Sequence, residues 1–381
     1  MDKNRFDYII CGGGASGLLL TKGLITDPFF AQKSILLIEK EEKNTHDRTW
    51  CFWESGNGEF ETIVHHRWDN AKFKSSDTAL DFPLNPYQYK MIRSGDFYQF
   101  MHNKTASASQ LTRLQSTVTS ITSNSSHTTV VTDQGTFEGG IVFSSIFEKK
   151  HLFNQIKYPV LQQHFIGWFI KTENPCFQAD QISFMDFDLP QKGETRFIYV
   201  LPFSSNEALV EFTLFSKDLL KTTEYEDGIV SYLAKINSGA YTIIEKEKGS
   251  IPMSCYPFDK KNKDTLFHIG TAGGWTKAST GFTFQKTLTK TKALITYLKT
   301  NKPLSQFEKR NRFWFYDLLF LDVLYRNNEL GSQLFSRMFQ KLKPKLVFKF
   351  LDEKTSPLHE LKILSSFPTH YFIKALFKRL F

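Results

Sequence analysis

The chain has 381 residues, of which 41% are hydrophobic and 23% are charged, and its formal net charge at pH 7 is +9. These proportions are those of a globular protein and exclude an intrinsically disordered chain. The length allows two domains, or one large domain with an insertion and a helical tail. The 38 phenylalanines indicate either an aromatic core or an apolar tunnel or membrane-facing surface.

A βαβ unit is predicted at the start of the chain. An apolar strand over Phe6–Cys11 runs directly into the loop Gly12–Gly17. An apolar helix follows to about Leu24, and Ser34–Glu39 forms a second strand. Because the first apolar run enters a glycine loop at once, we interpret it as a strand and not as a signal peptide.

The loop has the G-x-G-x-x-G spacing of dinucleotide-binding sites. Gly12 permits the tight turn, Gly14 lets the backbone approach a pyrophosphate, and Gly17 lets the helix pack closely on the strand. The helix that opens at Ala15 directs free N–H groups toward the phosphates. Glu39, at the end of the second strand, is placed to accept hydrogen bonds from both ribose hydroxyls. This spacing fits FAD and NAD equally.

The later elements follow from the same patterns of apolar and polar residues. Segments that alternate bulky apolar with small or polar residues are expected to form strands with one buried face. We predict a helix over Asn85–Lys104, short antiparallel strands over Leu111–Phe143, several strands over Gln162–Ser216, a buried strand over Phe267–Gly270, and helices beyond Pro303.

A second glycine-containing loop favours FAD. Gly270, Gly273 and Gly274 cluster beside Trp275, directly after the buried strand. Flavoproteins with this kind of N-terminal unit bring a late strand and glycine turn back to the ribityl chain and pyrophosphate. An ordinary strand-to-helix loop is the alternative interpretation.

Together these elements predict a mixed α/β fold. We expect a Rossmann-like FAD/NAD(P)-binding domain of the flavoprotein monooxygenase or glutathione reductase type. An antiparallel β-sheet layer for substrate is inserted into it, and a helical region follows. The predicted boundaries are 1–155 with 245–305 for the discontinuous FAD-binding domain, 156–244 for the β-rich substrate domain, and 306–381 for the helical basic region.

Most of the excess positive charge lies in that last region. From Gly331 to Phe381 there are ten Lys and Arg but three Asp and Glu, interleaved with Phe and Leu. The chain has no nucleic-acid-binding motif, so we favour peripheral contact with an anionic membrane surface over nucleic acid. A solvated basic face is the alternative. The apolar stretch Phe313–Tyr325 is interrupted by Asp317 and Asp322 and is too short to span a bilayer.

The four cysteines are widely spaced, without a C-x-x-C pair or a Cys/His cluster at metal-binding spacing. We therefore predict reduced thiols and no metal site. Combined with the basic tail, this predicts a cytoplasmic protein on the inner face of the membrane.

Several blocks of the sequence resemble the lycopene cyclase family, in the right order and over nearly the whole chain. Asp47–Glu54 (DRTWCFWE) is similar to the family's D-x-T-W-x-F-W signature, and Ala272–Phe282 (AGGWTKASTGF) to its second flavin motif. The chain most resembles the bacterial flavin-dependent β-cyclases. Further matching blocks are Met185–Phe187, Arg196–Pro202, Glu211–Thr213 and Gly249–Met253. Thr271 stands where many flavoproteins place an aspartate against the ribityl chain, so we assign that contact to backbone.

This resemblance implies a cofactor and a substrate. The cofactor is FAD in its reduced form, with NAD(P)H as the reductant, and Arg48, Thr49 and Trp50 join the glycine loops in binding it. The substrates are lycopene and related acyclic carotenoids, whose end groups become β-ionone rings. The reaction has no net redox change, and reduced FAD stabilises the cation or exchanges the proton.

The resemblance also implies an acid-initiated reaction, with Glu211 as the acid. Desolvation in an apolar pocket would keep this carboxyl protonated. The alternative interpretation is a paired structural carboxylate, or one on the exposed face of an edge strand. His164 and Asp186 also lie in family blocks and are candidates to relay or remove a proton, although a lone His in a strand is more often a core residue.

Two other functions remain open from the sequence. One is a flavin-dependent oxidoreductase on a hydrophobic isoprenoid, such as a geranylgeranyl reductase or a hydroxylase. The other is a non-enzymatic escort for isoprenoids or lipids, against which the intact Gly12–Gly17 loop and Glu39 argue.

Overall fold

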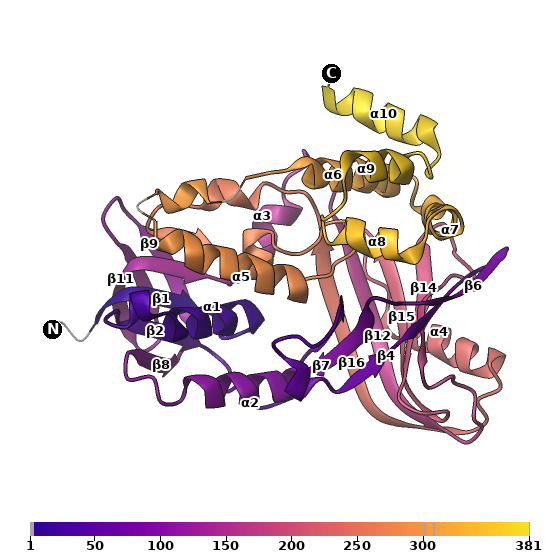
Figure 1. Cartoon of the computed structure of the whole chain (residues 1–381), viewed down its shortest axis with the longest axis horizontal. Helices are drawn as coiled ribbons and strands as arrows, with labels where there is room; N and C mark the ends of the chain where they lie inside the picture. Colours follow the sequence, from indigo (N-terminus) through magenta and orange to yellow (C-terminus); the bar gives the residue numbers. More distant parts are fainter. Residues whose placement is uncertain (1–3, 301, 308, 381) are drawn as a thin grey trace.

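The computed structural model describes residues 4–300, 302–307 and 309–380. This part of the chain forms two seven-stranded sheets, a three-stranded sheet and a set of C-terminal helices (Figure 1). The first sheet has the order β8-β2-β1-β11-β10-β9, with β17 beside β11. Its strands are β1 (Arg5–Cys11), β2 (Ile35–Glu39), β8 (Leu111–Gln115), β9 (Val118–Ser123), β10 (Thr128–Thr132), β11 (Gly135–Ser144) and β17 (Leu266–His268).

The first sheet is buried on both faces, which explains why its central strands are continuously apolar. Ile10 and Leu37 pack toward the helices on one face, whereas Ile9 and Leu36 pack with Val130 of β10 on the other. The covering helices are α1 (Ala15–Thr26), α2 (Ser94–Thr105) and α5 (Phe284–Leu298). The predicted βαβ unit is confirmed. One strand differs from prediction, since β8 pairs with β2 in parallel, not antiparallel.

The second sheet has the order β16-β12-β15-β14-β13-β5-β6. Its odd and even side chains point to opposite faces. One face packs on α4 (Thr222–Lys235), and the other faces the C-terminal helices. The strands predicted over 162–216 are confirmed as β12 to β15. The strands of this sheet are β5 (Asn70–Ser75), β6 (Thr78–Pro83), β12 (Leu161–Thr172), β13 (Gln181–Asp186), β14 (Thr195–Pro202), β15 (Glu207–Ser216) and β16 (Tyr241–Met253).

A three-stranded sheet, β3-β7-β4, lies between the two large ones (Figure 1). It consists of β3 (Thr49–Glu54), β4 (His66–Trp68) and β7 (Gln88–Arg93). The predicted helix over Asn85–Lys104 is therefore wrong in its first half, because the chain stays extended through β7 and becomes helical only at Ser94. Strand β7 has partners on both sides, and this long-range pairing overrides the local pattern.

The C-terminal region is helical, as predicted. Its helices are α6 (Arg312–Arg326), α7 (Gly331–Lys341), α8 (Pro344–Leu351), α9 (Pro357–Leu364) and α10 (Thr369–Leu380). Leu321, Phe335 and Phe348 pack on the second sheet, so these helices belong to its core. A short helix, α3 (Lys149–Phe153), precedes β12. Among the described residues, none of the helices combines the length and apolar character needed to cross a membrane.

The sheets divide the chain differently from the predicted boundaries. Strands β5 and β6, within 1–155, belong to the second sheet and pair there with β13. Strand β16 continues without interruption through residue 245, where the FAD-binding part was predicted to resume. The alternation of residues 70–83 predicts strands, but no local signal selects β13 as their partner.

Candidate active site

A cavity of about 920 Å³ lies between the three sheets and the C-terminal helices. Its wall includes the first glycine loop, β3, the second sheet, the loop before α5 and the C-terminal helices. Apolar and aromatic side chains make up much of this wall. Among its residues are Gly14, Ala15, Arg48, Thr49, Trp50, Cys51, Tyr199, Glu211, Glu247, Gly270, Phe282, Phe335 and Phe350.

The first glycine loop has the geometry that a pyrophosphate requires. Gly12 has φ +104°, and a Cβ on Gly17 would lie 1.9 Å from the Gly12 carbonyl oxygen, so strand and helix approach as closely as glycine allows. A Cβ on Gly14 would meet nothing within 4 Å, which leaves open space at the start of α1. Helix α1 has no side-chain cap, and Ala15 lines the cavity. These features fit a dinucleotide.

The carboxylate of Glu39 holds the same loop in place. Its Oε2 accepts a hydrogen bond from Gly13 N at 2.5 Å, and its Oε1 accepts one from Glu41 N at 3.0 Å. Glu39 thus lies beside the loop at the end of β2, where a ribose contact was predicted, but its side chain is outside the cavity wall.

Of the four cofactor-binding residues predicted in the second glycine loop, Gly270 lines the cavity and the other three serve packing or the turn. Gly270 lines the cavity with φ +61°, whereas Trp275 is buried in the core around α1 and α5. A Cβ on Gly273 would lie 2.2 Å from the His268 carbonyl oxygen. Gly274, with φ +73°, ends the short turn. Most of the residues predicted to bind the cofactor in this loop therefore shape the loop and do not face the cavity.

The block that begins at Asp47 enters the cavity along β3. Arg48 is exposed and donates its backbone N–H to Ser94 Oγ at 2.9 Å. Trp50 stacks on Phe284, with ring centroids 5.6 Å apart. The Thr49 hydroxyl donates a hydrogen bond to Glu247 Oε2 at 2.7 Å, which ties this block to the second sheet.

Glu211 lies in the cavity wall with only 7% of its surface exposed. Burial raises the pKa of its carboxyl well above the usual value, and the neighbouring Glu247 raises it further. Leu209, Thr213 and Phe215 share its face of β15, as the alternation of the strand requires. A carboxyl in this place is held in its protonated form and can serve as an acid.

His164 borders the cavity, but its ring packs against α4 on the face of the second sheet opposite to Glu211. Its Nε2 lies 2.7 Å from Ser216 Oγ, and its Nδ1 lies 2.6 Å from the Tyr225 hydroxyl of α4. Ser216 donates onward to the Asp218 carbonyl at 2.8 Å, so Nε2 carries the proton and Nδ1 accepts from Tyr225. Burial lowers the pKa of His164 to about 4. Both ring nitrogens are used within the protein, which fits the core role better than proton relay.

Asp186 is also separated from Glu211. It ends β13 and accepts a hydrogen bond from Asp188 N at 2.9 Å, outside the cavity wall. Burial raises the pKa of Asp186, while Lys74 and Lys235 oppose this shift. The structure thus brings Glu211 and His164 to the cavity wall and leaves Asp186 outside it, but the ring nitrogens of His164 are already bonded to Ser216 and Tyr225.

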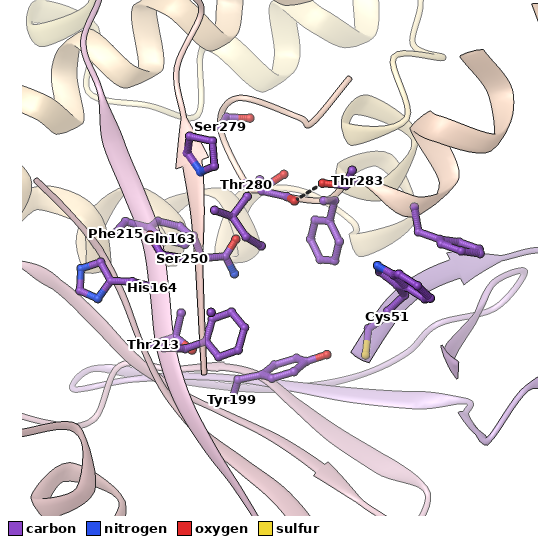
Figure 2. A pocket seen from close by; sticks show the side chains of 18 of the residues that line it. Cys51, Gln163, His164, Tyr199, Thr213, Phe215, Ser250, Ser279, Thr280 and Thr283 are labelled. Carbon is purple, nitrogen blue, oxygen red and sulfur yellow. Dashed lines mark hydrogen bonds between the residues drawn. The ribbon is translucent and has the colours of Figure 1, made fainter. Parts of the chain in front are cut away.

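Several cavity residues near Glu211 were not singled out as acid–base candidates from the sequence. Tyr199 and Tyr89 share a hydrogen bond between their hydroxyls at 2.8 Å. Figure 2 shows Tyr199 pointing toward Cys51 in the cavity, with Thr280 and Thr283 nearby and the His164 ring turned away from Tyr199. Glu247 is the most important addition. Its only sequence signal is that Glu245 and Glu247 share one face of β16.

A buried ion cluster fixes the C-terminal helices over the cavity. Lys277 Nζ, in the second glycine loop, lies 3.0 Å from Asp317 Oδ2 of α6 and 3.3 Å from Glu353 Oε1. Lys286 of α5 adds a contact of 2.9 Å to Glu353 Oε1. The loop, α5 and the helical region are therefore held together by opposite charges.

Comparison with known proteins identifies the family. A profile of the family described as "Lycopene cyclase protein" matches residues 7–377. This chain belongs to the lycopene cyclase family. The resemblance seen in the sequence blocks is confirmed, and the family supports an enzyme acting in carotenoid cyclisation. No curated protein sequence matched the chain.

Solved structures show the same fold at low identity. A geranylgeranyl bacteriochlorophyll reductase-like protein from Thermoplasma acidophilum is 11% identical, with TM-score 0.59, covering 98% of this chain and 96% of that one. A flavoprotein/dehydrogenase from Cytophaga hutchinsonii is 11% identical, with TM-score 0.60 and coverage of 95% and 99%. The p-nitrophenol 4-monooxygenase from Pseudomonas putida DLL-E4 is 10% identical, with TM-score 0.59 and coverage of 97% and 98%. The predicted flavoprotein fold class is confirmed.

Proposed function

We propose that this member of the family is a lycopene β-cyclase, which forms β-carotene from lycopene through γ-carotene. The observation that carries the proposal is the buried carboxyl of Glu211 in an aromatic cavity that also reaches the first glycine loop. Family membership supports a carotenoid substrate. The choice of β-rings rests on the resemblance to bacterial β-cyclases.

The substrate end groups are hydrocarbon, so ring closure begins with protonation of the terminal double bond. The protonated Glu211 carboxyl gives its proton to C2, which leaves positive charge at C1. The C5–C6 double bond attacks C1, and loss of the proton from C6 completes the β-ring. One proton enters and one leaves, so the reaction has no net redox change.

Aromatic side chains in the cavity wall provide an apolar and electron-rich environment. Tyr199 and Phe282 line the cavity and offer π faces to a cation. Gly14 and Ala15 at the start of α1 would hold the pyrophosphate of FAD. When bound and reduced by NAD(P)H, FAD supplies electron density that stabilises the positive charge.

The test is an anaerobic assay of purified protein with lycopene liposomes, FAD and NADPH. We expect Glu211→Gln to lower ring formation by about 10²–10⁴-fold, the usual contribution of a general acid. Glu207→Gln is the matched control, because it lies on the same strand but pairs with Lys171 at the surface. Folding and FAD binding are measured for both variants. A fully active Glu211→Gln enzyme would place the proton donor elsewhere.

The same assay separates the cyclase from an oxidoreductase. A reductase or hydroxylase would oxidise the reduced flavin, or consume oxygen, in proportion to product. The cyclase should form rings without net oxidation of flavin. Protein that binds no FAD even on reconstitution would favour an escort.

The proposal includes peripheral attachment to the inner face of the membrane from the cytoplasm. Leu358, Leu361, Ile373, Phe377 and Leu380 are exposed on α9 and α10, and α10 lies outside the other C-terminal helices (Figure 1). Lys362, Lys374 and Lys378 lie on the same two helices. Leu364, Phe367 and Phe372, at the turn between them, line the cavity. An apolar stripe with basic neighbours beside the cavity suits a bilayer that carries lycopene.

Liposome flotation tests this attachment. We expect Ile373→Glu with Phe377→Glu to weaken binding to vesicles containing anionic lipid, because two apolar anchors are lost. Phe29→Glu, at an exposed phenylalanine far from α10 in the sequence, is the control. Unchanged flotation of the double variant would place the contact on another surface. Substitution tests the membrane contact more specifically than truncation of the C-terminal helices, because truncation would also remove Phe348 and Ile363 from the core.

A further inference from the structure

Glu211 and Glu247 converge over one glycine of the second sheet. Strand β12 lies between β15 and β16, and Gly167 pairs with Glu211 on one side and with Glu247 on the other. The side chains of Glu211 and Glu247 point to the cavity face, as a side chain at Gly167 would. A Cβ on Gly167 would lie 2.8 Å from Glu211 Cγ and 3.2 Å from Glu247 Cγ. The missing side chain gives both carboxyl groups room to meet above the central strand.

The hydrogen bonds of Glu247 leave one of its oxygens for Glu211. Oε2 accepts the Thr49 hydroxyl at 2.7 Å. Oε1 is buried and has no other donor within the described residues. Glu211 is the carboxyl group that meets Glu247 above Gly167, and Glu247 raises the pKa of the Glu211 carboxyl. Two carboxyl groups can be hydrogen bonded to each other only when one of them carries a proton, so a proton on Glu211 would supply the donor that Glu247 Oε1 lacks.

The other titratable groups that face the Glu211–Glu247 pair do not neutralise its negative charge. Tyr199 from β14, Tyr89 from β7 and Cys51 from β3 are the other titratable groups that face Glu211. Burial raises the pKa of each of them, so all three are uncharged near neutral pH. The negative charge beside Glu211 therefore comes from Glu247.

We infer that Glu247 is the positioning residue that keeps the proton on Glu211, held in place by the Thr49 hydroxyl. This inference rests on the proposed cyclase function and assigns a task to two residues that the proposed reaction had left without one. It also explains why the block Asp47–Glu54 reaches across to the second sheet at Thr49.

The Glu211–Glu247 pair donates one proton and takes one proton back in each reaction. The O–H bond of Glu211 breaks as the C2–H bond forms, which leaves two adjacent carboxylates facing the cation. Ring closure then forms the C1–C6 bond. When the C6–H bond breaks, the proton returns to the pair and restores the starting state. Like charges side by side favour this return, because two carboxylates in contact resist being ionised together.

The first test is the pH profile of ring formation. Activity depends on protonated Glu211, so it falls as pH rises through the raised pKa of that carboxyl. Glu247→Gln removes the adjacent charge, and we expect the fall to move to lower pH by about one unit or more. Glu245→Gln is the matched control, since it is two residues away on the same face and pairs with Arg93. A profile that keeps its midpoint in Glu247→Gln overturns the inference, even if the rate is lower.

The second test needs no substrate. Infrared titration of purified protein follows the C=O stretch of protonated carboxyl groups, and the Glu211 band is the one lost in Glu211→Gln. We expect this band to persist at pH 8 in wild type, at the lowered frequency of a carboxyl bonded to a carboxylate. In Glu247→Gln it should disappear at lower pH.

The two tests separate failure of the inference from failure of the proposed function. Absence of a Glu211 band at pH 8 in wild type overturns the pair even if Glu247→Gln does not fold. If the band persists at pH 8 but the protein forms no rings, the shared proton is supported and the proposed cyclase function is rejected.

Discussion

Glu211 in the cavity wall and Glu353 in the ion cluster of Lys277 are both largely buried glutamates, yet their pKa values move in opposite directions. Burial alone would raise the pKa of both groups. For Glu353, the cations of Lys277 and Lys286 reverse this effect and lower the pKa to about 2. For Glu211, the second carboxyl of Glu247 adds to it.

The difference shows that, between two buried carboxyl groups, the charge of the neighbouring group decides which one stays ionised and which one keeps a proton. The cluster around Lys277 pairs opposite charges and joins the second glycine loop to α6 and the turn after α8. The Glu353 carboxylate stays ionised, and the cluster holds the structure together. The Glu211–Glu247 pair joins like groups on the two strands that flank β12 and retains a proton. One cluster is suited to stability and the other to proton transfer.

The largest expected effect on stability comes from removing the cation of the balanced cluster. Lys277 is 2% exposed, and Lys277→Met would leave Asp317 and Glu353 buried without it. We expect a loss of about 3–5 kcal/mol in the free energy of unfolding, as for other broken buried ion pairs. Denaturant unfolding at pH 7 measures this loss. A loss within 1 kcal/mol would mean that Lys286 alone balances the cluster.

Glu353→Gln should destabilise the protein in a pH-dependent way. The native pKa of Glu353 is about 2, below its unfolded value of 4.5, so its ionised form contributes stability above pH 4.5. A shift of this size corresponds to about 3 kcal/mol. The difference between wild type and variant should be full at pH 7 and shrink as pH falls from 4.5 toward 2. Unfolding at several pH values measures it, and a constant difference would contradict the pairing.

Glu211→Gln should have the smallest effect on stability and the opposite sign. The native state keeps a proton that the unfolded state releases above pH 4.5, so the wild-type carboxyl lowers stability as pH rises. We expect the variant to be more stable than wild type at pH 8 by at least about 1 kcal/mol. The gain should vanish below pH 4.5 in thermal unfolding. A less stable variant at pH 8 would show that Glu211 is ionised there.

The local features of this protein could be predicted from its sequence. The apolar run before Gly12 and the glycine spacing predict β1, the loop and α1, because strand burial and turn geometry depend on neighbouring residues. The blocks around Thr49 and Glu211 identified the family and the candidate acid. The alternation within 162–216 predicted four strands in their correct positions.

Contacts between residues distant in sequence could not be predicted in this way, because they depend on the packing of the whole chain. The pairing of β5 with β13 and the strand conformation of β7 depend on partners distant in sequence, so local periodicity could not supply them. The same holds for the site. Glu247 reaches Glu211 only because Gly167 lies between them on β12. His164 is turned toward Tyr225 by the alternation of that strand. Side-chain neighbours across a sheet are set by register, which no single segment encodes.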